Sequence, residues 1–106
     1  MNFNISIDKD FSFKLGAHEI KVYLVDAKHK KLKHEGDYHT EGVYLAEELS
    51  IYLLKTNPPS LIFSTFFHEL IHAIEHIYTI RIKHTDLNLI GECISQVLID
   101  NFQVKK

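Results

Sequence analysis

Residues 58–78 read PPSLIFSTFFHELIHAIEHIY, and this stretch decides the fold. Its two prolines break the preceding chain, and Ser60 is a suitable N-cap because its hydroxyl can accept from a free backbone N–H group. Apolar residues then occupy nearly every face of a predicted helix that runs to about Tyr78. A helix that is apolar all round is buried on all sides. The stretch therefore predicts a long helix inside the core of a small domain.

The same stretch is long enough to span a bilayer, but its polar residues argue against that location. It contains three histidines and two glutamates, and charged side chains are costly in lipid. The single cysteine, Cys93, fits a reducing compartment, and the first residues lack the basic and apolar pattern of a signal peptide. We therefore expect a cytoplasmic protein with no membrane partner. The formal net charge of −2 gives no sign of a nucleic-acid partner.

The front half of the chain favours β-strands. Alternation of polar and apolar residues predicts strands at residues 4–7 and 11–15, which could pair as a hairpin. Residues 19–25, EIKVYLV, are rich in β-branched and aromatic side chains, which favour strands. Residues 43–45 and 49–54 are predicted as further strands. The front half should therefore form a small antiparallel or mixed β-sheet.

A second helix is predicted after the first. Thr85 is a suitable N-cap, and the helix should run to about Phe102. Gly91 costs helix propensity, which indicates close packing against the first helix. The expected fold class is α+β, with the sheet first and the two helices after it. The main apolar stripe of the second helix is predicted to consist of Leu87, Ile90, Cys93, Ile94, Val97 and Leu98.

The first helix carries the chemistry, because His68, Glu69 and His72 fit the pattern H-E-x-x-H. Residues four apart on a helix lie one above the other, about 6 Å apart, so two imidazoles can bind one zinc ion at about 2.0–2.1 Å each. Glu69 lies about 100° around the helix and can reach a water on the metal without being a ligand. Zinc lowers the pKa of that water, and the glutamate accepts its proton as the water attacks a carbonyl.

The third ligand must come from elsewhere in the chain. His76 continues the same spacing, but three groups spread over about 12 Å of helix cannot converge on one ion, so it is expected in the cleft wall or exposed to solvent. Glu92 on the second helix is the preferred candidate, since it falls opposite the predicted apolar stripe. His84 and Asp86 are the alternatives.

These residues resemble the gluzincin branch of the zincin metallopeptidases, whose third zinc ligand is a glutamate on a separate helix. The layout of residues 1–106 is similar to the minimal single-domain zincins, including small phage- or prophage-encoded ones. The chain does not resemble the metzincins, because Glu75 and Tyr78 stand where their motif has glycine and histidine, and Met1 is the only methionine.

The resemblance implies a single zincin-like domain in which His68, His72 and Glu92 bind Zn²⁺ and Glu69 is the catalytic base. It also implies that residues 43–45 or 49–53 form the upper rim of a cleft and pair with a protein or peptide substrate in extended conformation. Larger gluzincins supply a histidine or tyrosine for the oxyanion. The candidates for that role here are Tyr38, His39 and Tyr78.

Three functions fit the sequence. The first is a zinc-dependent metallopeptidase, and the second is a zincin-fold binding module that keeps the metal but cleaves little or nothing. The third is a metal-free helical domain in which the polar residues of the first helix line a solvated strip. Glu69 favours the first, because a purely structural zinc site has no use for an acid between its histidines.

Overall fold

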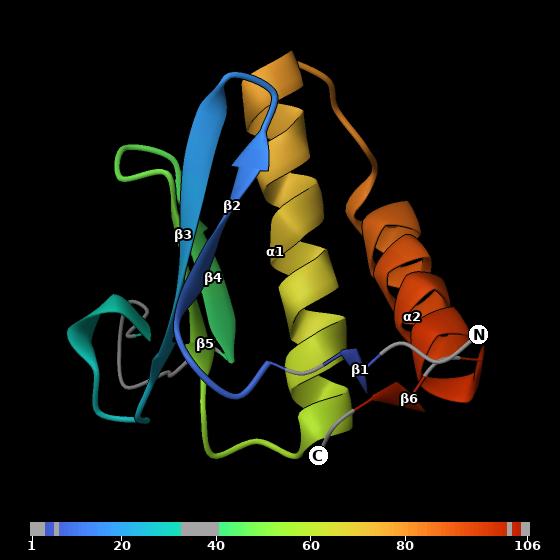
Figure 1. The fold of residues 1–106 in the computed structure, drawn as a ribbon. Helices are drawn as coiled ribbons and strands as arrows, with labels where there is room; N and C mark the ends of the chain where they lie inside the picture. Colours follow the sequence, from blue (N-terminus) through green and yellow to red (C-terminus); the bar gives the residue numbers. More distant parts are fainter. Residues whose placement is uncertain (1–3, 6, 33–40, 102, 105–106) are drawn as a thin grey trace.

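The computed structural model describes residues 4–5, 7–32, 41–101 and 103–104. Four of the described strands form one sheet, α1 packs against that sheet, and α2 lies on the far side of α1 (Figure 1). The predicted α+β class is therefore confirmed. The described elements are, in chain order, β1 (Asn4–Ile5), β2 (Phe11–Leu15), β3 (His18–Val25), a 3-10 turn (Lys30–Leu32), β4 (Gly42–Leu45), β5 (Ser50–Leu54), α1 (Pro59–Tyr78), α2 (His84–Asn101) and β6 (Gln103–Val104).

The sheet is mixed, with the strand order β2-β3-β5-β4. Strands β3 and β5 are parallel, and each outer strand is antiparallel to its neighbour. The chain turns between β2 and β3 at Gly16, whose φ of 60° suits a residue without a Cβ atom. The predicted hairpin between residues 4–7 and 11–15 is wrong, because β1 pairs in parallel with β6 and β2 pairs with β3. Alternation identifies a strand but does not specify its partner.

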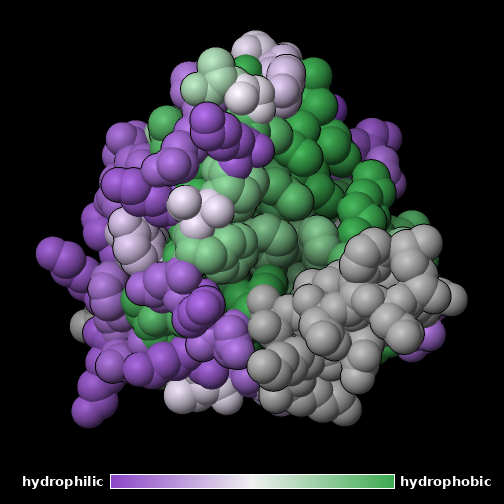
Figure 2. Space-filling view, viewed as in Figure 1, coloured by the Kyte–Doolittle hydropathy of each residue, from purple (hydrophilic) through white to green (hydrophobic). Residues whose placement is uncertain are grey.

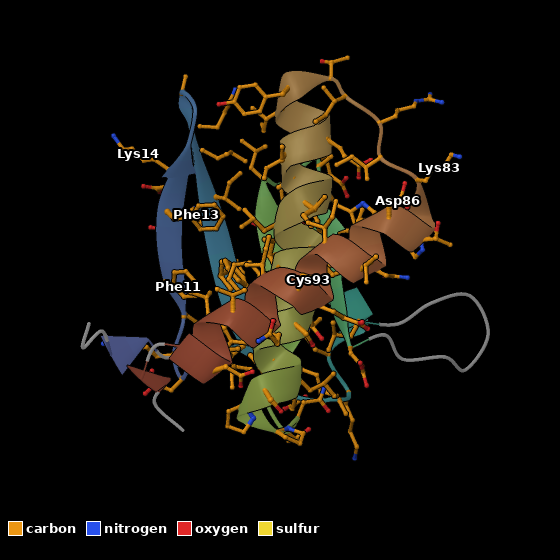
Figure 3. All side chains as sticks on the ribbon, turned by 90° about the vertical axis from the view of Figure 1, so that its right-hand side faces the viewer. Phe11, Phe13, Lys14, Lys83, Asp86 and Cys93 are labelled. Carbon is orange, nitrogen blue, oxygen red and sulfur yellow. The ribbon has the colours of Figure 1, made fainter. Side chains whose placement is uncertain are left out.

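The core lies between the sheet and α1. Alternate residues of the two central strands, Ile20 and Val22 on β3 and Ile51 and Leu53 on β5, are fully buried, as expected for one face of a pleated strand. They form one cluster with apolar residues of α1, including Phe66. On β2, Phe11 and Phe13 point toward the helix and Lys14 points away from it (Figure 3). This packing fixes α1, and with it the H-E-x-x-H motif, against the sheet.

The start of α1 differs from the expectation, whereas its last residue, Tyr78, agrees with it. Pro59 occupies the first turn, where its missing N–H group is not needed and its fixed φ suits a helix. Ser60 therefore lies inside the helix and is not the N-cap; no side chain of the described residues caps this turn. At the other end, Thr79 is left-handed with φ 55° and its N–H group donates to the carbonyl of Glu75. Within the described part of the chain, no helix is long and apolar enough to cross a membrane.

The buried face of α2 agrees with the predicted stripe at Leu87 and differs from it further along the helix. Leu87, Gly91 and Ser95 are buried, and a Cβ atom at Gly91 would lie 3.4 Å from the backbone nitrogen of His68. The close packing indicated by Gly91 is therefore confirmed. In contrast, Ile94 and Val97 of the predicted stripe are 38% and 48% exposed. Small residues let two helix backbones approach closely, and here that contact prevails over burial of the larger side chains.

The outward face of α2 is thus apolar and exposed. Cys93 lies at its centre, in the middle of the helix nearest the viewer (Figure 3). In the view of Figure 1, hydrophobic surface gathers in the middle and upper right, over β2, α1 and the connection to α2, and hydrophilic surface covers the outer side of the sheet (Figure 2). The exposed apolar side chains after α1 are Ile80, Leu89, Ile90, Ile94 and Val97.

Candidate metal centre

Three histidines come together between α1 and α2. His68 and His72 project from successive turns of α1, and His84 is the first residue of α2. One ring nitrogen of each lies within 4.8 Å of the others, and the Nε2 atoms of His68 and His72 are 3.2 Å apart. Two nitrogens bound to one tetrahedral zinc ion at the usual bond length are roughly 3.3 Å apart. The spacing therefore fits a shared metal ion.

Two of these histidines also have a polar side-chain partner outside the cluster. The Nδ1 atom of His72 is 2.9 Å from a carboxylate oxygen of Glu75, and His68 makes a side-chain hydrogen bond with Asn88. Metal-binding histidines are typically held in this way, with one nitrogen on a protein acceptor and the other on the metal. The donor set is thus organised for an ion at the centre of the three rings.

The electrostatics of His68 also suit a metal ligand. Burial lowers the pKa of His68 below its usual value, and the neighbouring His72 and His84 lower it further. The ring is therefore neutral at physiological pH and carries a lone pair. Neutral imidazoles bind zinc, copper, iron and nickel well, and the three rings could hold such an ion.

Glu69 lies beside this cluster without joining it. Its side chain is buried, and one carboxylate oxygen is 3.9 Å from Nε2 of His68. Burial raises the pKa of Glu69 to about 7, while a hydrogen bond from the backbone N–H group of Tyr44 on β4 works in the opposite direction. A carboxyl group with such a pKa can accept and release a proton near neutral pH.

The remaining predicted site residues lie around the cluster. Glu92 is exposed on α2 and lines a cavity of about 530 Å³ together with His68 and Glu69. Among the described residues, the ligand atoms that lie close together belong to His68, His72 and His84, and Glu92 is not one of this group. Ligation by Glu92 stays a prediction, and His84, named as an alternative from the sequence, has the geometry. The other alternative, Asp86, is exposed in the first turn of α2.

A second cavity, of about 570 Å³, lies between β4 and the histidines. Gly42, Val43 and Tyr44 line one side, and the opposite side includes the three histidines together with Glu69 and His76. Gly42 packs tightly against α1, since a Cβ atom there would lie 2.5 Å from a side-chain carbon of Thr65. Strand β4, the last strand in the order of the four-stranded sheet, therefore forms a rim beside the three histidines.

The sequence analysis did not identify Tyr44 as a site residue or as a hydrogen-bonding partner of His76. The Tyr44 hydroxyl is 2.8 Å from Nδ1 of His76, and His76 lines the second cavity while it is exposed to solvent. Burial raises the pKa of Tyr44, which keeps the phenol protonated. Gly42 and Tyr44 are two residues apart on a strand, so their side-chain positions share one face. This spacing could have indicated that Tyr44 faces the same cavity as Gly42. Of the proposed oxyanion donors, Tyr38 and His39 lie outside the described residues. Tyr78 is at the end of α1, where its hydroxyl approaches Gly16.

Comparison with known proteins identifies no relative of this chain. No protein-family model matches the chain, and no curated protein or solved structure matches it either. The chemistry of the metal centre must therefore be inferred from its own residues.

Proposed function

We propose that this chain is a zinc-dependent metallopeptidase with the layout of a minimal zincin. The observation that carries the proposal is the meeting of His68, His72 and His84 with the buried carboxyl group of Glu69 at its side. Three histidines with an open position and a neighbouring acid are typical of catalytic zinc sites. With His84 as the third ligand, the site would lack the glutamate ligand that marks the gluzincins.

In this proposal each residue has a distinct task. The three histidines would hold the ion, which when bound polarises a peptide carbonyl and makes an attacking water more acidic. Glu69 would accept the proton of that water as its oxygen bonds to the carbonyl carbon. The same carboxyl group would then give the proton to the leaving amine as the C–N bond breaks. A pKa near 7 suits both transfers.

The position of strand β4 favours a peptide as the proposed substrate. An extended peptide can add to the outer strand of a sheet through backbone hydrogen bonds, and β4 is an outer strand of the four-stranded sheet in the described part of the chain, beside the cluster. His68 and Glu69 line both cavities, of about 530 and 570 Å³. These cavities offer room for substrate side chains on either side of the cleaved bond. The proposed partner is therefore a protein or peptide in extended conformation.

A second candidate function is a zincin-like module that binds zinc and a partner strand without cleaving it. The contact between Tyr44 and His76 favours this reading, because the Tyr44 hydroxyl already has a histidine as its hydrogen-bonding partner. Stabilisation of the oxyanion is usually a large part of catalysis. The two candidates share the metal centre and differ in hydrolysis.

The first experiment is elemental analysis of the untagged protein after exposure to zinc and removal of excess metal. About one zinc ion per chain supports both candidates, and the absence of bound zinc refutes both.

The second experiment is incubation with a complex peptide mixture and identification of new termini by mass spectrometry. Cleavage by the wild type that is absent with Glu69→Gln supports the peptidase. Equal product patterns from the two proteins would assign the cleavage to a contaminant.

A further inference from the structure

Glu75 connects the metal helix with the segment that brings in the third histidine. It lies on α1 three residues after His72, and its side chain is 18% exposed. One carboxylate oxygen is 2.9 Å from Nδ1 of His72. The other oxygen accepts a hydrogen bond of 2.9 Å from the backbone N–H group of Ile82. A single carboxylate thus holds a ligand ring and the connection between the helices.

The main chain of Glu75 holds the start of the same connection. Its carbonyl accepts from the N–H groups of Thr79 and Ile80, the latter at 3.1 Å. Thr79 is left-handed, so the chain turns sharply after α1. The carboxylate then fixes Ile82, two residues before His84. Through these contacts Glu75 constrains the path by which His84 returns to the helix that carries His68 and His72.

The contact with His72 also selects which ring nitrogen carries a proton. One carboxylate oxygen of Glu75 faces Nδ1 of His72 and the other accepts from the N–H group of Ile82, and a carboxylate can only accept. A His72 ring that carries a single proton therefore holds it on Nδ1, facing the Glu75 oxygen. Its lone pair is left on Nε2, the atom that lies 3.2 Å from Nε2 of His68.

We propose that Glu75 is the positioning residue of the three-histidine cluster, fixing His72 with its Nε2 lone pair toward the metal and anchoring the connection that delivers His84. This inference rests on the metal centre of the proposed function. It differs from the ordinary role of a glutamate spaced three residues from a histidine, which would add a few tenths of a kcal/mol to helix stability and leave metal binding unchanged.

The first test needs no metal. In the metal-free protein at pH 8, nitrogen chemical shifts of the histidine rings report which nitrogen is protonated. We expect His72 to carry its proton on Nδ1 in the wild type and to shift toward a mixture in Glu75→Ala. The amide of Ile82 should exchange with solvent at least 10-fold faster in the variant. An unchanged His72 spectrum together with unchanged Ile82 exchange would overturn the inference, whether or not the protein binds zinc.

The second test measures zinc affinity by competition with a chromophoric chelator. Loss of a partner that orients a ligand typically weakens metal binding by about 10–100-fold, and we expect this range for Glu75→Ala. Glu75→Gln keeps the side-chain size but offers one acceptor for two donors, so its affinity should fall between wild type and Glu75→Ala. Glu19→Gln, at an exposed position on β3, is the matched control. Wild-type affinity in Glu75→Ala would refute the positioning role, whereas a wild type without zinc affinity would refute the proposed function alone.

Discussion

The two helices contribute to the three-histidine cluster in different ways. Helix α1 is packed between the sheet and α2 (Figure 1), and the spacing of His68 and His72 is fixed by its own backbone hydrogen bonds. Helix α2 packs on α1 through Leu87, Gly91 and Ser95 and exposes much of its apolar surface. The position of His84 therefore depends on contacts between distant segments. One part of the site is local in the sequence, and the other part exists only in the folded protein.

The local part should give the largest functional effect. Glu69→Gln preserves the shape of the side chain but removes the group that accepts a proton, so hydrolysis should fall by about 10²–10⁴-fold. Zinc content should stay at the wild-type level, because the carboxyl group lies outside the histidine group. The measurement is the initial rate on a peptide that the wild type cleaves, with elemental analysis of both proteins. If the rate is retained, Glu69 is not the base.

The tertiary part is tested by comparing His84→Ala with Glu92→Ala. His84 belongs to the group whose ligand atoms meet and Glu92 does not, so the first variant should bind zinc more than 100-fold more weakly, exceeding the typical loss of about 10–100-fold for an outer partner. The second variant should stay within about 3-fold of wild type, a difference below 1 kcal/mol. The reverse result would restore Glu92 as the third ligand and leave His84 beside the site. Chelator competition on both variants decides between them.

The same contrast explains what could be predicted from the sequence. Strands β3, β4 and β5 and the helix α1 agree with the predicted ranges to within two residues, because periodicity and breakers act locally. The partner of β1 and the buried face of α2 depend on segments far apart in the chain. For α2 the buried face was predicted from the large apolar side chains, several of which are exposed. The small Gly91 correctly indicated a close approach to α1. His84 remained one of two alternatives to Glu92, because its place depends on the contacts of Glu75 with the connection between the helices.

The contact between the helices can be probed with two apolar residues of α2. Leu87 is 1% exposed and Ile94 is 38% exposed. Leu87→Ala should reduce the free energy of unfolding by about 2–5 kcal/mol, whereas Ile94→Ala should change it by less than about 0.5 kcal/mol. Urea denaturation of both variants in the metal-free state measures this. A large cost at Ile94 would mean that the exposed face is covered in solution.

Gly91 tests how closely α2 must approach α1 for His84 to reach its partners. A Cβ atom at this position would meet the backbone of His68 at 3.4 Å, an ordinary contact distance, so Gly91→Ala should fold and bind zinc as the wild type does. The larger side chain of Gly91→Leu cannot fit in that space. It should cost about 1–3 kcal/mol of stability through overpacking and should weaken zinc binding at the same time. If Gly91→Leu loses stability but keeps wild-type zinc affinity, the N-terminal end of α2 is held to α1 independently of its middle. Glu75 and the connection would then be sufficient to place His84.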